Sequence, residues 1–230
     1  MNDFLTLAQE RYSVRKFQQK PVSQQHIQHI LQAGQAAPTA CNFQPQRILV
    51  LQSEEALVKM RRCTKCHFNA PLGMLVCFDQ NQSWKRKYDG AESGWVDASI
   101  VTTHMMLAAH EIGVGSCWVM YFIPEAVKAE FDLPDHWIPT ALLVMGYPTR
   151  QQKERPKPPR HSVCDLVHEN GYSMEKSARM GAMLSAQQQK EGDELTDWLR
   201  RFCNRKWNSE FSREMSRSCT EMVEDWCSAP

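Results

Sequence analysis

Apolar and polar residues follow two distinct patterns along the chain. Short aliphatic runs, typical of buried strands, occupy residues 47–51, 73–78, 117–122 and 140–145. Apolar residues at helical spacing predict helices over 2–10, 54–62, 95–112 and 124–131, and one that starts after Ser23 and ends at Gly34. The alternation of strands with helices predicts a mixed α/β domain, in which the sheet is parallel or mixed.

The segments between these elements differ in character. Residues 36–45 hold two prolines among small and amide residues, and this composition predicts a loop. Residues 81–90 are polar and basic, and we expect them to be exposed. A linker rich in Pro, Lys and Arg covers 149–161. Beyond it, residues 168–222 lack Val, Ile and Pro, which favours helix over strand. We therefore predict one domain over 1–167 and a helical C-terminal extension over 168–230.

Composition narrows the class of protein. The 230 residues carry a formal charge of +1 with 42% apolar residues, as in ordinary globular chains. A sequence pI of about 7.6 gives no reason to expect a nucleic-acid partner. The longest uncharged stretch of the most apolar region, 98–110, is shorter than the ~18 residues that span a membrane. With an acidic residue at Asp3 and no signal peptide, we expect a cytoplasmic protein whose nine cysteines are reduced.

Phosphate-binding residue types gather near the N-terminus. In an extended segment Arg11, Ser13 and Arg15 point to the same side, so two guanidinium groups and a hydroxyl can converge. Guanidinium groups bind phosphate oxygens bidentately, which makes this a candidate phosphate clamp. A solvated cluster of charges is the alternative interpretation.

Two further segments add to this candidate site. In the loop 36–45, Asn42 and Gln44 offer both donors and acceptors, which suit the edge of a planar heterocycle. A second basic cluster, Arg155, Lys157 and Arg160, could close over the same phosphate. A simple turn and a solubilising basic linker are the respective alternatives.

Taken in order, these motifs resemble the FMN-dependent nitroreductase family. The matching segments are 10–17 (ERYSVRKF), 37–46 (APTACNFQPQ), 113–118 (GVGSCW), 146–148 (GYP) and a basic, Pro-rich segment ending at Arg160, together with the long apolar helix. The resemblance covers residues 10 to about 167. It implies an α+β fold with a central mixed sheet between helices, an intertwined homodimer, and FMN at the dimer interface contacted by both chains.

The resemblance also implies roles for individual residues. The FMN phosphate and ribityl chain would be held by Arg11, Ser13, Arg15 and Arg160. The flavin of the partner's site would lie against Pro38, Thr39 and Ala40, with Asn42 hydrogen-bonded to the isoalloxazine edge. Flavin N5 would face the backbone N–H near Met120 and Tyr121, and the pocket would be shaped by Tyr121 and Phe122.

Three positions depart from the family pattern. Met120 stands where Gly is frequent, Gln46 where Trp is usual, and Ala40 where Ser is common. These differences bear on the identity of the substrate more than on the binding of the flavin. The expected reaction is hydride transfer from NADH or NADPH through the flavin to a nitroaromatic, a quinone or a similar acceptor. Because the flavin carries this chemistry, no catalytic acid or base is assigned.

Other interpretations of the sequence stay open. One is a low-turnover redox sensor or binding protein based on flavin or thiols. Another is a metal-binding protein that uses its cysteines, to which the C-x-x-C at Cys63 and Cys66 draws attention. A lone C-x-x-C lacks the second pair of ligands that a structural zinc site needs.

Overall fold

The computed structural model describes residues 3–153, 159–160, 162–168 and 171–172. The chain divides into two compact units, Met1–Lys157 and Pro158–Pro230. The predicted helical extension over 168–230 lies almost wholly outside the described residues, and a domain boundary after residue 167 stays a prediction.

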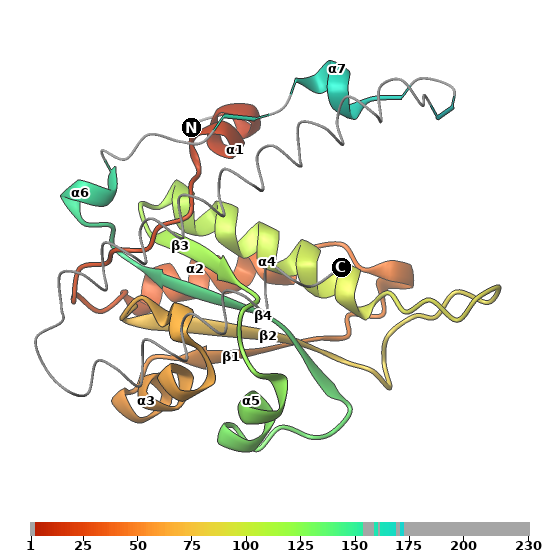
Figure 1. Ribbon diagram of the computed structural model, residues 1–230, viewed down its shortest axis with the longest axis horizontal. Coiled ribbons are helices and arrows are strands. Elements are labelled where there is room, and N and C mark those ends of the chain that lie inside the picture. Colours follow the sequence, from red (N-terminus) through yellow and green to blue (C-terminus); the bar gives the residue numbers. More distant parts are fainter. Residues whose placement is uncertain (1–2, 154–158, 161, 169–170, 173–230) are drawn as a thin grey trace, which may run out of the picture. The chain divides into compact units, whose positions relative to one another are not determined.

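Four strands form the sheet of the first unit (Figure 1). They are β1 (Gln46–Leu51), β2 (Leu72–Asp79), β3 (Gly115–Val119) and β4 (Trp137–Gly146), in the order β1-β2-β4-β3. The predicted mixed sheet is wrong for these strands, because every strand pair is antiparallel. The helices between β1 and β2 and between β3 and β4 connect neighbouring strands at one end of the sheet, so they are not crossovers between parallel strands. The fold is α+β, as expected.

Five helices of seven residues or more accompany the sheet: α1 (Phe4–Glu10), α2 (Gln24–Gln35), α3 (Glu54–Cys63), α4 (Gly94–Glu111) and α5 (Pro124–Glu130). Shorter ones are η1 (Ala40–Asn42), η2 (Lys65–His67), α6 (Arg150–Lys153) and, in the second unit, α7 (Val163–Leu166). The predicted N-cap is confirmed, because the Ser23 hydroxyl accepts the backbone N–H of His26 at 3.3 Å.

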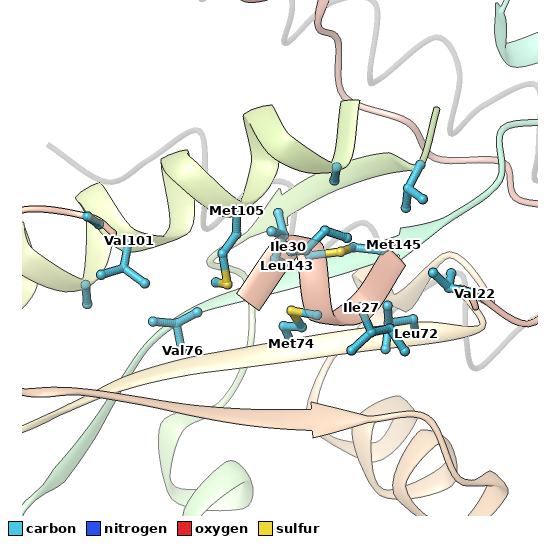
Figure 2. Close-up of a cluster of buried hydrophobic side chains, with 14 of the residues drawn as sticks. Val22, Ile27, Ile30, Leu72, Met74, Val76, Val101, Met105, Leu143 and Met145 are labelled. Atoms are coloured by element: carbon cyan, nitrogen blue, oxygen red, sulfur yellow. The ribbon is translucent and has the colours of Figure 1, made fainter. Parts of the chain in front are cut away.

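One face of the sheet is covered by α2 and α4 (Figure 1). Side chains of both helices and of β2 and β4 interdigitate there, as Figure 2 shows for Ile30, Val101 and Met105. The prediction that Gly34 ends its helix is wrong, since α2 continues to Gln35. A Cβ on Gly34 would lie 2.8 Å from Cγ of Met105, so the glycine lets the two helices approach closely.

A second cluster of buried residues lies on the opposite face, beneath α3 and α5. The N-terminal segment contributes Val14 and Phe17 to it. Cys63, Cys77 and Cys117 are buried in the same cluster. This segment is therefore part of the core, although it contains no regular strand.

We expect Gly94→Ala to destabilise the protein by about 1–3 kcal/mol, the usual cost of overpacking. A Cβ at this position would lie 2.1 Å from the ring of Phe78, which is fully buried. Chemical denaturation measures the loss. Adding Phe78→Leu should reduce the penalty of Gly94→Ala; strictly additive losses would contradict the proposed clash.

Candidate functional site

The segment that carries Arg11, Ser13 and Arg15 is fixed by its backbone to the ends of two strands. The Val14 N–H donates to the Ser116 carbonyl at 2.9 Å, and the Gln18 N–H donates to the Tyr147 carbonyl at 2.8 Å. Gly115 makes this approach possible, because a Cβ there would lie 2.7 Å from Val14. With Val14 directed into the core, the alternate residues Ser13 and Arg15 are left outside it.

Ser13 and Arg15 meet at one side chain, the thiol of Cys117 on β3. Burial raises the pKa of this thiol, and the positive charge of Arg15 and hydrogen bonds from both side chains partly offset the rise. Arg11 is directed differently, with its guanidinium Nη1 3.7 Å from the Met106 sulfur of α4. Thus the structure brings two of the three predicted phosphate donors together, and it places the third against the C-terminal half of α4.

The loop after β3 lies next to the C-x-x-C segment. The prediction of a strand over 117–122 is wrong at its end, because β3 stops at Val119. Met120 and Tyr121 are 64% and 68% exposed. The Thr64 hydroxyl donates to the Tyr121 carbonyl and accepts the Cys66 N–H at 3.0 Å.

The same two segments are joined a second time, by the Ile123 N–H, which donates to the Cys63 carbonyl at 3.1 Å. Thr64, which is buried, is thus a positioning residue for the exposed loop that contains Met120, Tyr121 and Phe122. Sequence reasoning missed it, since a single threonine after a helix carries no recognisable signal.

The loop 38–44 has an unusual backbone. Cys41, Asn42 and Gln44 all have φ near +50°, in the left-handed region that residues other than glycine seldom adopt. Such a run persists only where surrounding contacts hold it, and strained loops of this kind cluster at functional sites. The Thr39 hydroxyl supplies one contact by accepting the Gln44 N–H at 3.1 Å.

Asp97 on α4 supplies the main anchor of this loop. Its carboxylate accepts the Ala40 N–H at 2.9 Å and the Ser93 hydroxyl at 2.8 Å, and the residue is only 2% exposed. Asp97 was not singled out from the sequence. The signal was present, because a carboxylate in the first turn of an otherwise apolar helix needs a partner.

A cavity of about 500 Å³ adjoins the anchored loop. Three sets of residues line it: Pro38, Thr39 and Ala40 from the loop; Trp84, Arg86, Ala91 and Glu92 from the segment before α4; and Ser93, Val96, Asp97 and Ile100 at the start of α4. The volume is in the range of small-molecule sites.

The two candidate regions lie at different places along α4. The loop 38–44 is tied to Asp97 in the first turn of the helix. Arg11 contacts Met106, and the Tyr12 ring packs edge-on against His110 near the other end. At 1.5 Å per residue, Asp97 and Met106 are separated by about 13 Å along the axis. A single chain therefore keeps the Arg11–Arg15 segment and the Asn42 loop apart.

Arg160 belongs to the second unit and is exposed. Its predicted contact with a phosphate stays a prediction.

The described residues contain no group of three or more His, Cys, Asp or Glu side chains that could hold a metal ion. Burial raises the pKa of Cys63 to about 11. None of the helices in the described part of the chain is long and apolar enough to cross a membrane.

We expect Asp97→Ala to cost about 1–3 kcal/mol of unfolding free energy, because it leaves the partly buried Ala40 N–H and Ser93 hydroxyl without their acceptor. Asp97→Asn keeps an acceptor oxygen in the same place, so its loss of unfolding free energy should be smaller. Urea denaturation of both variants provides the measurement. Equal stability of the Ala and Asn variants would show that the carboxylate does not hold the loop.

The buried thiols should resist alkylation in the native protein. Burial raises the pKa of Cys63 to about 11 and that of Cys77 to about 12. At pH 8 we expect both to react about a hundredfold or more slowly than in the unfolded chain, because only the thiolate attacks. Peptide mapping after labelling, with and without guanidinium, measures the two rates. Similar rates in both states would contradict the burial.

The comparison with known proteins assigns the chain to a family. The sequence profile of the Nitroreductase family matches residues 8–71 and 65–147. A relative from Methanothermobacter thermautotrophicus, named as a candidate NADH dehydrogenase/NAD(P)H nitroreductase, is 30% identical over 161 residues, covering 66% of this chain and 81% of the relative. An FMN reductase (NAD(P)H) from Bacillus subtilis is 23% identical, covering 97% of this chain and 92% of its own length.

A solved structure agrees with this assignment. The crystal structure of a nitroreductase family protein from Clostridium difficile is 38% identical, with a TM-score of 0.71, and the match covers 75% of this chain and 100% of that one. The chain belongs to the nitroreductase family.

Proposed function

We propose that the protein is an NAD(P)H-dependent FMN oxidoreductase that works as an intertwined homodimer. Membership of the nitroreductase family supports the class of enzyme. The names of its relatives, among them an FMN reductase (NAD(P)H) and NADPH-dependent oxidoreductases, support the cofactor and the electron donor. The physiological acceptor is proposed only as a class: a nitroaromatic, a quinone or a similar compound.

The placement of Ser13 and Arg15 is the observation that supports the cofactor site. A hydroxyl and a guanidinium group side by side are donors suited to a phosphate dianion, and Arg11, which contacts Met106 in this structure, would have to turn to join them. The backbone of the segment is already fixed to β3 and β4, so little ordering would be needed on binding. The chemistry of these donors supports the assignment of the FMN phosphate to this segment.

The loop 38–44 would supply the other half of the cofactor site, on the partner's flavin. Within one chain α4 holds this loop about 13 Å or more from the Arg11–Arg15 segment along its axis, as described above. In the proposed dimer, a second copy of the chain would present its own loop 38–44 to this segment. Pro38, Thr39 and Ala40 would then face the flavin, and the Asn42 amide could reach its polar edge.

An apolar surface on α4 supports this association. Trp95 and Val96 are 47% and 59% exposed, and they border a groove of about 470 Å³ that continues along Ser99, Ile100 and Thr103. Large apolar side chains grouped on one helix face are a feature of surfaces that pair with another protein. We assign this face to the dimer interface.

When bound, FMN would supply the acceptance and donation of hydride. The residues of the chain would then position the flavin and polarise its ring. Arg11 and Arg15 would hold the phosphate end, while the Met120–Tyr121 backbone, fixed by Thr64, would offer an N–H to the flavin ring. Tyr121 and Phe122 would shape the space in which donor and acceptor stack in turn.

The alternative functions have less support than a flavin oxidoreductase. A thiol sensor needs an accessible thiolate, and burial raises the pKa of Cys63, Cys77 and Cys117. Cys41 is exposed and Cys66 is half-buried, so these two are the thiols that such a sensor would have to use. A cysteine-based metal site has no support in the part of the chain described above. A cytoplasmic location stays a prediction.

The visible absorption spectrum tests the proposed function. We expect the purified protein to be yellow with flavin bands that bleach when NADH or NADPH is added without oxygen. The donor that bleaches faster identifies the preferred one. A protein that stays colourless after incubation with FMN would contradict the proposal.

We expect the double variant Arg11→Ala/Arg15→Ala to lose FMN during gel filtration. Each charge-assisted contact contributes about 1.5–3 kcal/mol, so the two together should weaken binding about a hundredfold or more. Lys16→Ala, on the same segment but bonded to Gln151, is the matched control and should keep its flavin. Unchanged flavin content in the double variant would refute the phosphate assignment.

A further inference from the structure

A short arm projects from the first unit between β2 and α4. It comprises residues 82–92 and appears as the yellow excursion beside the N-terminal end of α4 in Figure 1. Its two sides are bonded to each other: Lys85 and Glu92 form an antiparallel bridge, and the Arg86 N–H donates to the Ala91 carbonyl at 2.9 Å. Gly90, with φ of +72°, makes the turn at its end.

The base of the arm is held by one carboxylate. Glu92 accepts hydrogen bonds from the Ser83 hydroxyl at 2.5 Å and from the Gln80 amide at 3.3 Å. It also lies 3.8 Å from the Lys85 ammonium. The arm is therefore an ordered feature with a defined direction.

The tip of the arm is cationic and aromatic. Lys85, Arg86 and Lys87 are consecutive; Lys85 is paired with Glu92 and Arg86 with Asp89. Tyr88 is 97% exposed. The Lys87 side chain has no hydrogen bond or ion pair with any described residue. Neither Lys87 nor Tyr88 thus contributes to holding the fold.

The arm also forms one wall of the cavity beside Pro38, Thr39 and Ala40, to which Trp84 and Arg86 contribute. If the proposed function holds, this loop lies against a flavin, so the cavity opens where a nicotinamide ring must stack. Residues 83–86 lead away from the sheet, and residues 87–89 form the turn at the tip, where the Gly90 N–H donates to the Arg86 carbonyl at 2.8 Å. The arm thus holds Lys87 and Tyr88 beyond the residues that line the cavity.

We infer that the arm recognises the adenosine end of the electron donor and selects NADPH over NADH. Lys87 binds the 2′-phosphate, and the Tyr88 ring stacks on the adenine. The 2′-phosphate is the one group by which the two donors differ, and a cationic side chain is what reads it. Aromatic stacking on a base is insensitive to that phosphate. This inference rests on the proposed function for the identity of the donor.

Direct binding tests the inference without turnover. The probes are adenosine 2′,5′-bisphosphate and 5′-AMP, which lacks the 2′-phosphate, titrated calorimetrically into the FMN-loaded protein. We expect the bisphosphate to bind about tenfold more tightly, and Lys87→Ala to remove most of that difference. Lys59→Ala, which removes an equal charge on α3, is the matched control. Equal affinity for both probes in the wild type would overturn the inference.

Steady-state kinetics separate the two parts of the arm. Lys87→Ala should lower kcat/KM for NADPH about tenfold more than for NADH. In the wild type, a higher salt concentration should lower kcat/KM for NADPH more than for NADH, because salt screens the contact with the phosphate. Tyr88→Ala should raise KM for both donors by a similar factor. A loss common to both donors in Lys87→Ala, or a change in its oligomeric state, would show that the arm has another role.

The failure of this inference differs from the failure of the proposed function. A protein that binds no FMN, or whose flavin neither donor reduces, contradicts the proposed function. A protein that is reduced by both donors with equal kcat/KM, and that does not distinguish the two probes, is a flavin oxidoreductase whose arm does not select the donor.

Discussion

The rigidity of α4 is the constraint on which the proposed site depends. This helix packs on the sheet over its whole length and carries one candidate region at each end. Its geometry fixes their separation along the axis at about 13 Å. We propose that another copy of the chain presents its own loop 38–44 to the Arg11–Arg15 segment, so that each cofactor site draws on two chains.

Different contacts fix the chain segments that lie at the two ends of α4. At the N-terminal end, Asp97 holds a loop whose left-handed residues would otherwise be strained. At the C-terminal end, the N-terminal segment is fixed by backbone bonds and by the absence of a side chain at Gly115. At both ends, buried contacts hold the backbone of a segment whose polar groups stay accessible: loop 38–44 at one end and the Arg11–Arg15 segment at the other. In a flavin enzyme the protein positions the cofactor, and such fixed polar groups can do so.

Much of the fold could be predicted because its signals are local. Aliphatic runs located all four strands, and Ser23 correctly marked the start of α2. The antiparallel sheet could not be predicted, because strand order depends on contacts between segments far apart in the sequence. Gly34 was misjudged for the same reason: its small size serves the packing of Met105 from another helix.

The site shows the same division. The chemistry of Arg11, Ser13, Arg15 and Asn42 is visible in the residue types, and their spacing follows a known family pattern. Asp97 and Thr64 act by holding other segments, so their importance emerges only from the hydrogen bonds they make.

The most direct test of the central claim is the flavin content of mixed dimers. Chains carrying Arg11→Ala/Arg15→Ala would be co-expressed with differently tagged chains carrying Ala40→Trp, and the mixed dimer isolated through both tags. If each site draws on two chains, both defects fall in one site, and the mixed dimer keeps one flavin, half the wild-type content, while both parent homodimers are empty. A mixed dimer as empty as its parents would contradict a site shared between chains.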